Sequence, residues 1–228
     1  MSRVLAIRHH VEDSPGLIGE AFAARGYAVD VAMMDADHPT PDLVGYDALV
    51  ILGSTHAVYD DAIEAAWFGR ELALIATAQR RAVPVLGICF GAQALCRYHG
   101  GEVSASDEPE VGWYEVEPVG ESPLEPGPWF EYHFDRCTLP ATAEPWATTP
   151  AAVQAFAVGA DVGVQFHPEI DDAQLAQWLS GGDEGVRAVG LDPAALLERT
   201  RRETPAARGR AQRLVDLFVA HAAARARS

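Results

Sequence analysis

The segment Val85–Gln93 has the composition of a buried strand that turns sharply into a helix, with a cysteine at the turn. Glycines stand two residues before and two residues after Cys89. They allow the backbone to turn tightly and present the side chain between them, as in the nucleophile elbow that carries a serine in other hydrolases. The N-terminus of the following helix stabilises negative charge and so favours the thiolate. The segment therefore predicts a nucleophilic Cys89, and the alternative is a buried structural cysteine.

A second segment, Gly163–Glu169, places His167 and Glu169 at the end of another predicted strand. A thiol nucleophile needs a group that removes its proton and later protonates the leaving amine, and histidine is suited to that near neutral pH. A carboxylate two residues further on can orient the imidazole and stabilise its charged form. A His-Pro-Glu triplet alone also occurs in surface loops. Together with Cys89, it predicts a Cys-His-Glu triad for acyl transfer.

The elements that must position these residues alternate between strand and helix. Apolar runs predict buried strands at residues 4–7, 27–33, 48–52 and 83–88. Shorter alternating segments, such as 111–116 and 152–158, predict an antiparallel extension of the same sheet between 102 and 163. Helical periodicity and end signals predict helices at 15–25, 60–81, 92–99, 171–179, 193–202 and 206–224.

This pattern predicts an α/β fold with a mixed, mainly parallel central sheet and helices on both faces. We expect one domain over residues 1–228, with a catalytic core at about 1–180 and C-terminal helices at about 190–226. With 49% hydrophobic and 22% charged residues, the chain can bury a sizeable core, which excludes a mainly disordered protein.

The charge and cysteine content exclude several classes of partner. A net charge of −16 disfavours nucleic acid and anionic membranes as partners. No apolar stretch is long enough to span a bilayer, and no secretion signal is evident. Three cysteines without a CxxC pair predict reduced thiols in a cytoplasm and no structural zinc site. The C-terminal residues 199–228 hold 8 Arg and 2 acids, and we expect a helix face that is solvated or packed on the acidic body.

Together, the two segments resemble the motifs of the class I, or triad, glutamine amidotransferases. Gly87–Gln93 is similar to the family's nucleophile motif, and Gln165–Glu169 is similar to its His-x-Glu motif almost residue for residue. The resemblance implies that Cys89 is the nucleophile, that His167 is the base and acid, and that Glu169 orients His167. Two separate motifs in the family's order make a chance match improbable.

The resemblance also implies two backbone donors of an oxyanion hole. Phe90 follows the nucleophile directly, and residues 50–60 are similar to the family's loop after the third strand, which offers Gly53 or Ser54 as the second donor. That loop usually reads Gly-Gly-Pro, whereas here Ser54 replaces the second glycine and Thr55–His56 replace the proline and its neighbour. A serine N–H can still donate where its backbone tolerates the local geometry. The choice between Gly53 and Ser54 therefore stays open.

Three polar residues are similar to family positions near the substrate. Gln93 matches a position that helps hold the substrate glutamine, and its alternative is a glutamine on a helix surface. His133 and Asp135, together with residues 110–113, resemble the subgroup related to the amidotransferase domain of GMP synthetase, in which the His-x-Asp stretch lies near the substrate pocket. The alternative for His133 is a loop histidine with its hydrogen bonds satisfied. The remaining histidines lie in no motif and are assigned no role: His9, His10, His38, His56, His99 and His221.

The reaction implied is hydrolysis of the side-chain amide of L-glutamine through a γ-glutamyl thioester, without a metal or an organic cofactor. The residues after Glu169 are too few for an ATP-using synthase domain and contain no GxxxxGK[ST] motif, so we expect the ammonia to pass to a separate synthase subunit. One alternative is a stand-alone hydrolase of γ-glutamyl amides or peptides. The other is a catalytically silent binding or regulatory module, because a fold alone does not fix a function.

Overall fold

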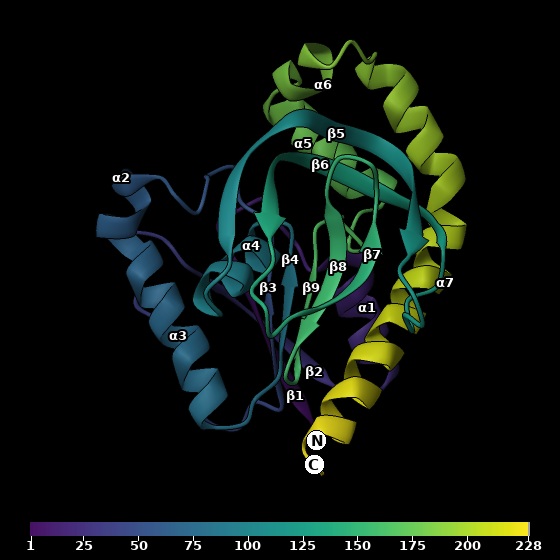
Figure 1. Cartoon of the computed structure of the whole chain (residues 1–228). Helices are drawn as coiled ribbons and strands as arrows, with labels where there is room; N and C mark the ends of the chain where they lie inside the picture. The colour runs from purple at the N-terminus through teal and green to yellow at the C-terminus, as the bar shows by residue number, and fades with distance from the viewer. Residues whose placement is uncertain (228) are drawn as a thin grey trace.

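The computed structural model describes residues 1–227, and Ser228, the last residue of the predicted domain, lies outside them. Nine strands form one sheet in the order β2-β1-β3-β4-β9-β8-β7-β5-β6 (Figure 1). The first four neighbouring pairs are parallel and the other four are antiparallel. The predicted α/β fold with a mixed central sheet is therefore confirmed.

The parallel half is built from short, apolar strands, as the sequence predicts. Its strands are β1 (Arg3–Arg8), β2 (Ala28–Met33), β3 (Ala48–Ile51), β4 (Val85–Ile88) and β9 (Asp161–Val164). Alternate residues of β1 enter opposite faces of the sheet: Val4 and Ala6 join one core cluster, and Leu5 and Ile7 join the other. Because side chains alternate along a strand, a run that is apolar at every position buries both faces of the sheet.

The antiparallel half consists of β5 (Glu102–Pro118), β6 (Gly127–Thr138), β7 (Glu144–Thr148) and β8 (Val153–Val158). The long pair β5–β6 arches over one end of the sheet in Figure 1, next to α5 and α6. A register shift between Ala105 and Glu110 divides this pair in two. The predicted antiparallel extension of the same sheet is confirmed, and β5 is far longer than the segment 111–116 that the alternation indicated.

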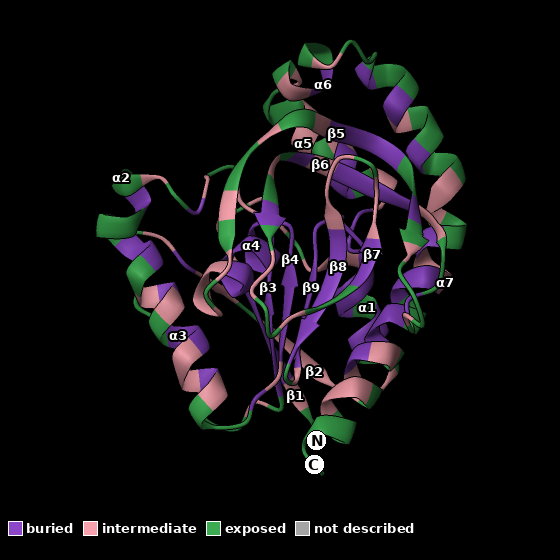
Figure 2. Cartoon of the chain, in the orientation of Figure 1, coloured by how far each residue is buried: buried purple, intermediate pink, exposed green. Residues whose placement is uncertain are grey.

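Helices cover both faces. One face carries α1 (Gly16–Ala24) and α7 (Pro193–Arg225), and the other carries α3 (Gly69–Arg80) and α4 (Phe90–Tyr98), with the core between the layers (Figure 2). The predicted helix 60–81 is a succession of α2 (Asp61–Ile63), the π-helical turn η1 (Glu64–Phe68) and α3. The remaining helices are α5 (Asp172–Gly181) and α6 (Glu184–Ala188). No helix within residues 1–227 is both long enough and apolar enough to cross a membrane.

The prediction of two C-terminal helices, 193–202 and 206–224, is wrong, because α7 runs unbroken through Pro205. Proline removes one helical hydrogen bond and normally ends or kinks a helix. Here buried residues on both sides of the proline, including Leu196 and Leu214, belong to one core cluster that spans the interruption. The Arg-rich part of this helix pairs with acids of the body, including Arg208 with Glu20, as the charge distribution led us to expect.

Candidate active site

Cys89 occupies the sharp turn between β4 and α4. Its backbone has φ 51° and ψ −106°, and it is one of two non-glycine residues with positive φ in the described chain. A side chain on Gly91 would overlap the carbonyl group of Ile51, and one on Gly87 would overlap the backbone of Gly91. Gly91 is therefore required for the turn to pack against β3, and Gly87 is required for the start of α4 to pass close to β4. Such strain at a single residue is typical of functional sites.

His167 and Glu169 lie in the loop that follows β9, next to β4 in the sheet. The His167 Nδ1 atom lies 2.7 Å from Glu169 Oε1, and both side chains are buried. The backbone N–H of His167 donates to the carbonyl of Phe130 on β6 at 2.7 Å. This bond anchors the loop to the antiparallel half of the sheet. The structure thus brings His167 and Glu169 together in the way that the sequence predicts.

The imidazole of His167 faces Cys89. Gly53 lies against both residues, since a Cβ on Gly53 would be 3.0 Å from His167 Cε1 and 3.8 Å from Cys89 Cβ. Burial disfavours the charged ring, but the charges of Glu169 and Cys89 outweigh it, and together they raise the pKa of His167 well above 6.5. The arrangement therefore favours a protonated His167 beside the sulfur, which is the state that can give a proton to a leaving group.

The backbone around the sulfur offers free donors. Within residues 1–227, the N–H groups of Phe90, Gly53 and Ser54 donate to no protein acceptor. The Phe90 N–H belongs to the first turn of α4, where intrahelical partners are absent. Two such donors beside a nucleophile are the requirement for an oxyanion hole. The three predicted donor residues therefore have N–H groups that are not used within the described protein.

Gln93 does not lie on a helix surface. It is buried, and its Nε2 donates to Gln165 Oε1 at 3.2 Å, while Gln165 Nε2 lies 3.5 Å from Cys89 Sγ. The surface alternative for Gln93 is therefore wrong. The Gln93–Gln165 pair thus links the first turn of α4 to the segment just before His167. The sequence places Gln165 within a motif without giving it a role, because its contact with the sulfur depends on the pairing of β4 with β9.

His133 lies on strand β6 rather than in a loop, and its ring is fully engaged. Nδ1 lies 2.9 Å from the Asp135 carbonyl, and Nε2 lies 3.1 Å from Glu110 Oε2 and 3.4 Å from Glu131 Oε2. The loop alternative is wrong because turn residues on either side of this segment conceal a long strand. Strand β6 contacts the nucleophile one residue earlier, because the Tyr132 carbonyl oxygen lies 3.9 Å from Cys89 Sγ.

Asp135 is turned away from His133 and toward the loop that follows β3. Its Oδ1 accepts a hydrogen bond from Tyr59 Oη at 2.6 Å. That bond, burial and the negative charge of Asp135 raise the pKa of Tyr59 to about 12, so the phenol stays protonated. The contact ties the loop carrying Gly53 to strand β6, and it gives Asp135 a structural partner instead of a free carboxylate.

Glu131 is a buried acid that the sequence does not single out. Neither of its carboxyl oxygens makes a hydrogen bond among the described residues, although His133 Nε2 lies 3.4 Å from Oε2. Burial, followed by the neighbouring charge of Glu110, raises its pKa well above 4.5, against the opposing effect of His167. The surroundings of Glu131 therefore favour the protonated form of this carboxyl group. The alternation of β6 would place Glu131 and His133 on one face if the strand were recognised from sequence.

His9 is the second residue of the site that sequence analysis missed. It lies in no motif, yet its Nδ1 lies 2.8 Å from the carbonyl oxygen of Gly53. Its partner on the other side is Glu71, which is 62 residues away in the sequence. No local pattern connects these two residues, so only the fold could reveal the contact.

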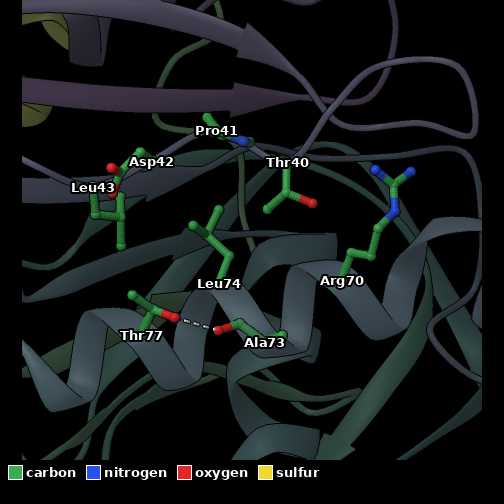
Figure 3. Close-up of a pocket in the computed structure, with 8 residues that line it drawn as sticks. All are labelled: Thr40, Pro41, Asp42, Leu43, Arg70, Ala73, Leu74 and Thr77. Carbon is green, nitrogen blue, oxygen red and sulfur yellow. Dashed lines mark hydrogen bonds between the residues drawn. The ribbon is translucent and has the colours of Figure 1, made fainter.

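A surface pocket lies elsewhere, between α3 and the loop before β3 (Figure 3). The Arg70 guanidinium at its edge donates to the backbone carbonyls of His38 and Asp35. No residue of the Cys89 site lines this pocket. Among residues 1–227, no group of three or more His, Cys, Asp or Glu residues could hold a metal ion.

Comparison with known proteins places this geometry in a family. Residues 16–177 match the family model of class-I glutamine amidotransferase. A GMP synthase [glutamine-hydrolyzing] from Porphyromonas gingivalis is 31% identical over 174 residues, which cover 71% of this chain and 33% of that protein. One from Phenylobacterium zucineum is 41% identical over 100 residues, which cover 39% of this chain and 19% of that protein. The chain thus spans a third or less of the length of these curated relatives.

Solved structures show the same fold along nearly the whole chain. A glutamine amidotransferase from Thermotoga maritima superposes with a TM-score of 0.84 at 28% identity, covering 96% of this chain and 98% of that one. A glutamine amido transferase from Methylobacillus flagellatus gives a TM-score of 0.82 at 23% identity, covering 97% and 95%. The second likeness, at its lower identity, concerns the fold alone.

Proposed function

Because the chain belongs to the class I glutamine amidotransferase family, we propose that it hydrolyses the side-chain amide of L-glutamine through Cys89, His167 and Glu169. The observation that carries this proposal is the buried His167–Glu169 pair, at 2.7 Å, whose ring faces a cysteine held on a strained elbow. We assign Cys89 as the nucleophile. His167 is the proton carrier, and Glu169 keeps the ring oriented and stabilises its charge.

The first half-reaction is acylation. The Cys89 thiolate attacks the amide carbon of glutamine, a C–S bond forms, and the carbonyl oxygen becomes an oxyanion. The N–H groups of Phe90 and of Gly53 or Ser54 stabilise that oxyanion, an effect worth roughly 3–4 kcal/mol per donor in another enzyme. The C–N bond then breaks as His167 passes its proton to the departing nitrogen. The products are ammonia and a γ-glutamyl thioester on Cys89.

The second half-reaction releases glutamate. His167, now neutral, takes a proton from a water molecule that attacks the thioester carbon. The C–S bond breaks, which restores the thiolate beside a protonated His167. This cycle needs a reduced Cys89, in keeping with a reducing compartment such as a cytoplasm. Around this centre we assign Gln93, His133 and Asp135 to the substrate pocket; the buried positions of Gln93 and His133 make their contribution one of shaping its wall.

The ammonia goes, in this proposal, to a separate synthase subunit. The chain matches only the shorter part of proteins named GMP synthase [glutamine-hydrolyzing], and its fold resembles a putative GMP synthase subunit from Thermoplasma acidophilum. That structure gives a TM-score of 0.63 at 22% identity and covers 75% of this chain and 85% of that one. The likeness to that structure concerns the fold alone, and the acceptor of the ammonia is left to experiment.

The test is ammonia release by the purified chain from glutamine, beside a panel of γ-glutamyl amides and peptides. We expect turnover of glutamine that is lost in Cys89→Ala and His167→Ala and is kept in Cys96→Ala, whose thiol is also buried but lies further along α4. Faster turnover of a γ-glutamyl peptide would replace the amidotransferase with a stand-alone hydrolase. Absence of turnover, together with no labelling of Cys89 by a glutamine-mimicking chloroketone, would indicate a silent module.

A further inference from the structure

His9 is the first residue after the ladder of β1, and its buried ring is bonded at both nitrogens. Nδ1 lies 2.8 Å from the carbonyl oxygen of Gly53, and Nε2 lies 2.7 Å from Glu71 Oε2 on α3. The His9 and Glu71 side chains are 1% and 0% exposed. The Glu71 carboxylate accepts the Nε2–H of the ring. When both ring nitrogens carry a proton, the Nδ1–H donates to the Gly53 carbonyl. This contact is the only one that the described side chains make with that carbonyl.

The same ring packs against the side chain of Phe90, whose backbone N–H is the other expected oxyanion donor. The centroid of the His9 ring lies 4.9 Å from that of Phe90 in an edge-to-face arrangement, and 5.1 Å from that of Trp67. Phe90 follows the nucleophile and carries a free N–H group. His9 therefore contacts one residue from each of the two segments that are expected to supply an oxyanion donor.

The Gly53 carbonyl is significant because a peptide group is planar. The carbonyl of Gly53 and the N–H of Ser54 belong to one rigid unit, so holding the first fixes the direction of the second. Gly53 lies against the reacting residues, since a Cβ added to it would come within 3.0 Å of His167 Cε1. No proline stiffens this loop, in which Ser54-Thr55-His56 follow Gly53. A side chain that hydrogen-bonds the Gly53 carbonyl supplies the rigidity that a proline would otherwise give to this loop.

The pair is also placed where it costs stability. A buried ion pair is often no better for folding than apolar residues of the same volume. Here Glu71 Oε1 has no partner within the described chain, which adds to that cost. If residue 9 only filled the space between Trp67 and Phe90, an apolar side chain would serve equally well. The presence of a hydrogen-bond donor, the His9 ring, at this position points to a function for the hydrogen bond to Gly53 itself.

We infer that His9, held by Glu71, is a positioning residue that orients the Gly53–Ser54 peptide so that the Ser54 N–H points at the developing oxyanion. This inference rests on the proposed function, and it resolves the choice between Gly53 and Ser54 in favour of Ser54. His9 acts through the peptide and makes no contact with the substrate. Its effect is thus confined to the steps in which an oxyanion forms.

Two conservative variants separate the two hydrogen bonds of the ring. Asn at position 9 places its amide nitrogen near the Nδ1 position and can still donate to Gly53, whereas Gln reaches the Nε2 position and keeps only Glu71. We expect His9→Gln to lower kcat for glutamine by about 10- to 100-fold, less than deletion of a donor outright, with KM changed by less than about twofold. We expect His9→Asn to retain most of the activity. His99→Gln is the matched control. His99 lies at the C-terminal end of α4 and also pairs with a buried carboxylate, that of Asp161, at 3.0 Å.

Two further readouts distinguish positioning from simple destabilisation. Iodoacetamide alkylates Cys89 by forming a C–S bond and expelling iodide, a step without an oxyanion, so its rate is expected to be the same in His9→Gln and the wild type. The amide resonance of Ser54 is expected to move in His9→Gln and to stay near its wild-type position in His9→Asn. Equal kcat for the Gln and Asn variants, or alkylation slowed in step with kcat, would overturn the inference.

The proposed function and this inference can fail separately. If the wild-type chain releases no ammonia from glutamine, the proposed function fails. The Ser54 amide resonance then decides on His9 alone: a shift that is specific to His9→Gln supports the positioning contact, and an unmoved resonance overturns it.

Discussion

Gly16 and Glu169 meet backbone to backbone, so closely that a Cβ on residue 16 would overlap the Glu169 carbonyl oxygen. The next residue, Leu17, donates its N–H to the same oxygen at 2.9 Å. The start of α1 is thus seated on the residue that we propose orients His167. A glycine near the N-terminus thereby becomes part of the support of the triad.

Replacing Gly16 with alanine is expected to lower both activity and stability. The side chain would be strained at φ +42° and would push Glu169 from its place against His167. We expect a loss of about 1–3 kcal/mol in the free energy of unfolding and at least a tenfold loss in kcat/KM for glutamine. Urea unfolding and ammonia release measure the two effects.

Gly26→Ala is the control for this variant. Gly26 also has a positive φ, +82°, but a Cβ there would meet nothing within 4 Å. It therefore reports the cost of backbone strain without displacement of Glu169. Equal losses of activity in the two variants would show that Gly16 has no particular link to the triad.

Glu169→Gln is expected to move the pH profile as well as lower the rate. Burial alone would lower the pKa of His167, and the charges of Glu169 and Cys89 raise it well above 6.5. Without the carboxylate the pKa of His167 falls, so the protonated ring is lost at a lower pH. The alkaline limb of kcat/KM is expected to shift to lower pH, and kcat to fall by a factor of about 100 or more, given about 10⁴ in another triad.

The measurement is the rate of ammonia release from about pH 5 to pH 10, a range that brackets the ordinary pKa of histidine. Asp13→Asn serves as the control because Asp13 interacts with Glu169 and bonds the Trp178 indole at 3.2 Å, without bonding His167. An alkaline limb of Glu169→Gln that coincides with that of the wild type would show that Glu169 does not hold the proton on His167.

The sequence was sufficient for the parts of the molecule whose signals are local. Apolar runs such as Val85–Ile88 read as buried strands because they pack on both faces. The elbow at Cys89 is encoded by glycines two residues away, and the segment around His167 carries its own carboxylate. Each signal fits within one strand and the turn that follows it, so no knowledge of the fold was needed.

Features that depend on tertiary packing could not be predicted in this way. The contact between His9 and Gly53 joins residues 44 positions apart that share no motif. The continuity of α7 through Pro205 results from packing on both sides of the proline, which local propensity does not register. The strand position of His133 was concealed by turn residues on either side of its segment, and it becomes evident only from the pairing of β6 with β5.

Glu131→Gln is expected to stabilise the protein increasingly as the pH rises. The folded chain keeps a proton on Glu131 that the unfolded chain loses above pH 4.5, because burial raises the pKa of this carboxyl. The folded state then binds more protons, so this group makes stability fall with rising pH, by at most about 1.4 kcal/mol per pH unit. The glutamine variant removes that dependence.

Urea unfolding at about pH 5 and about pH 8 checks the expectation, because the unfolded carboxyl is more fully ionised at the higher value. The gain in the free energy of unfolding over the wild type should be larger at the higher pH. Glu117→Gln, at an exposed position of β5, should show no such trend. A gain that is the same at both pH values would mean that Glu131 is ionised in the folded protein.

Pro205→Ala is expected to raise the stability of the protein. Residue 205 is exposed and lies in the interior of α7, where proline lacks the N–H that would bond the carbonyl of Arg201. Proline is about 3 kcal/mol less favourable than alanine in a helix interior, so a gain of about 1–3 kcal/mol in the free energy of unfolding is expected.

Pro193→Ala is the matched control for Pro205→Ala. Pro193 lies in the first turn of α7, where a missing donor costs nothing, and the substitution would remove its buried ring. Because the side chain of residue 205 is exposed and has no role in the proposed reaction, kcat for glutamine should not change. A fall in stability in Pro205→Ala would mean that the proline sets a bend that α7 needs in order to pack on both sides.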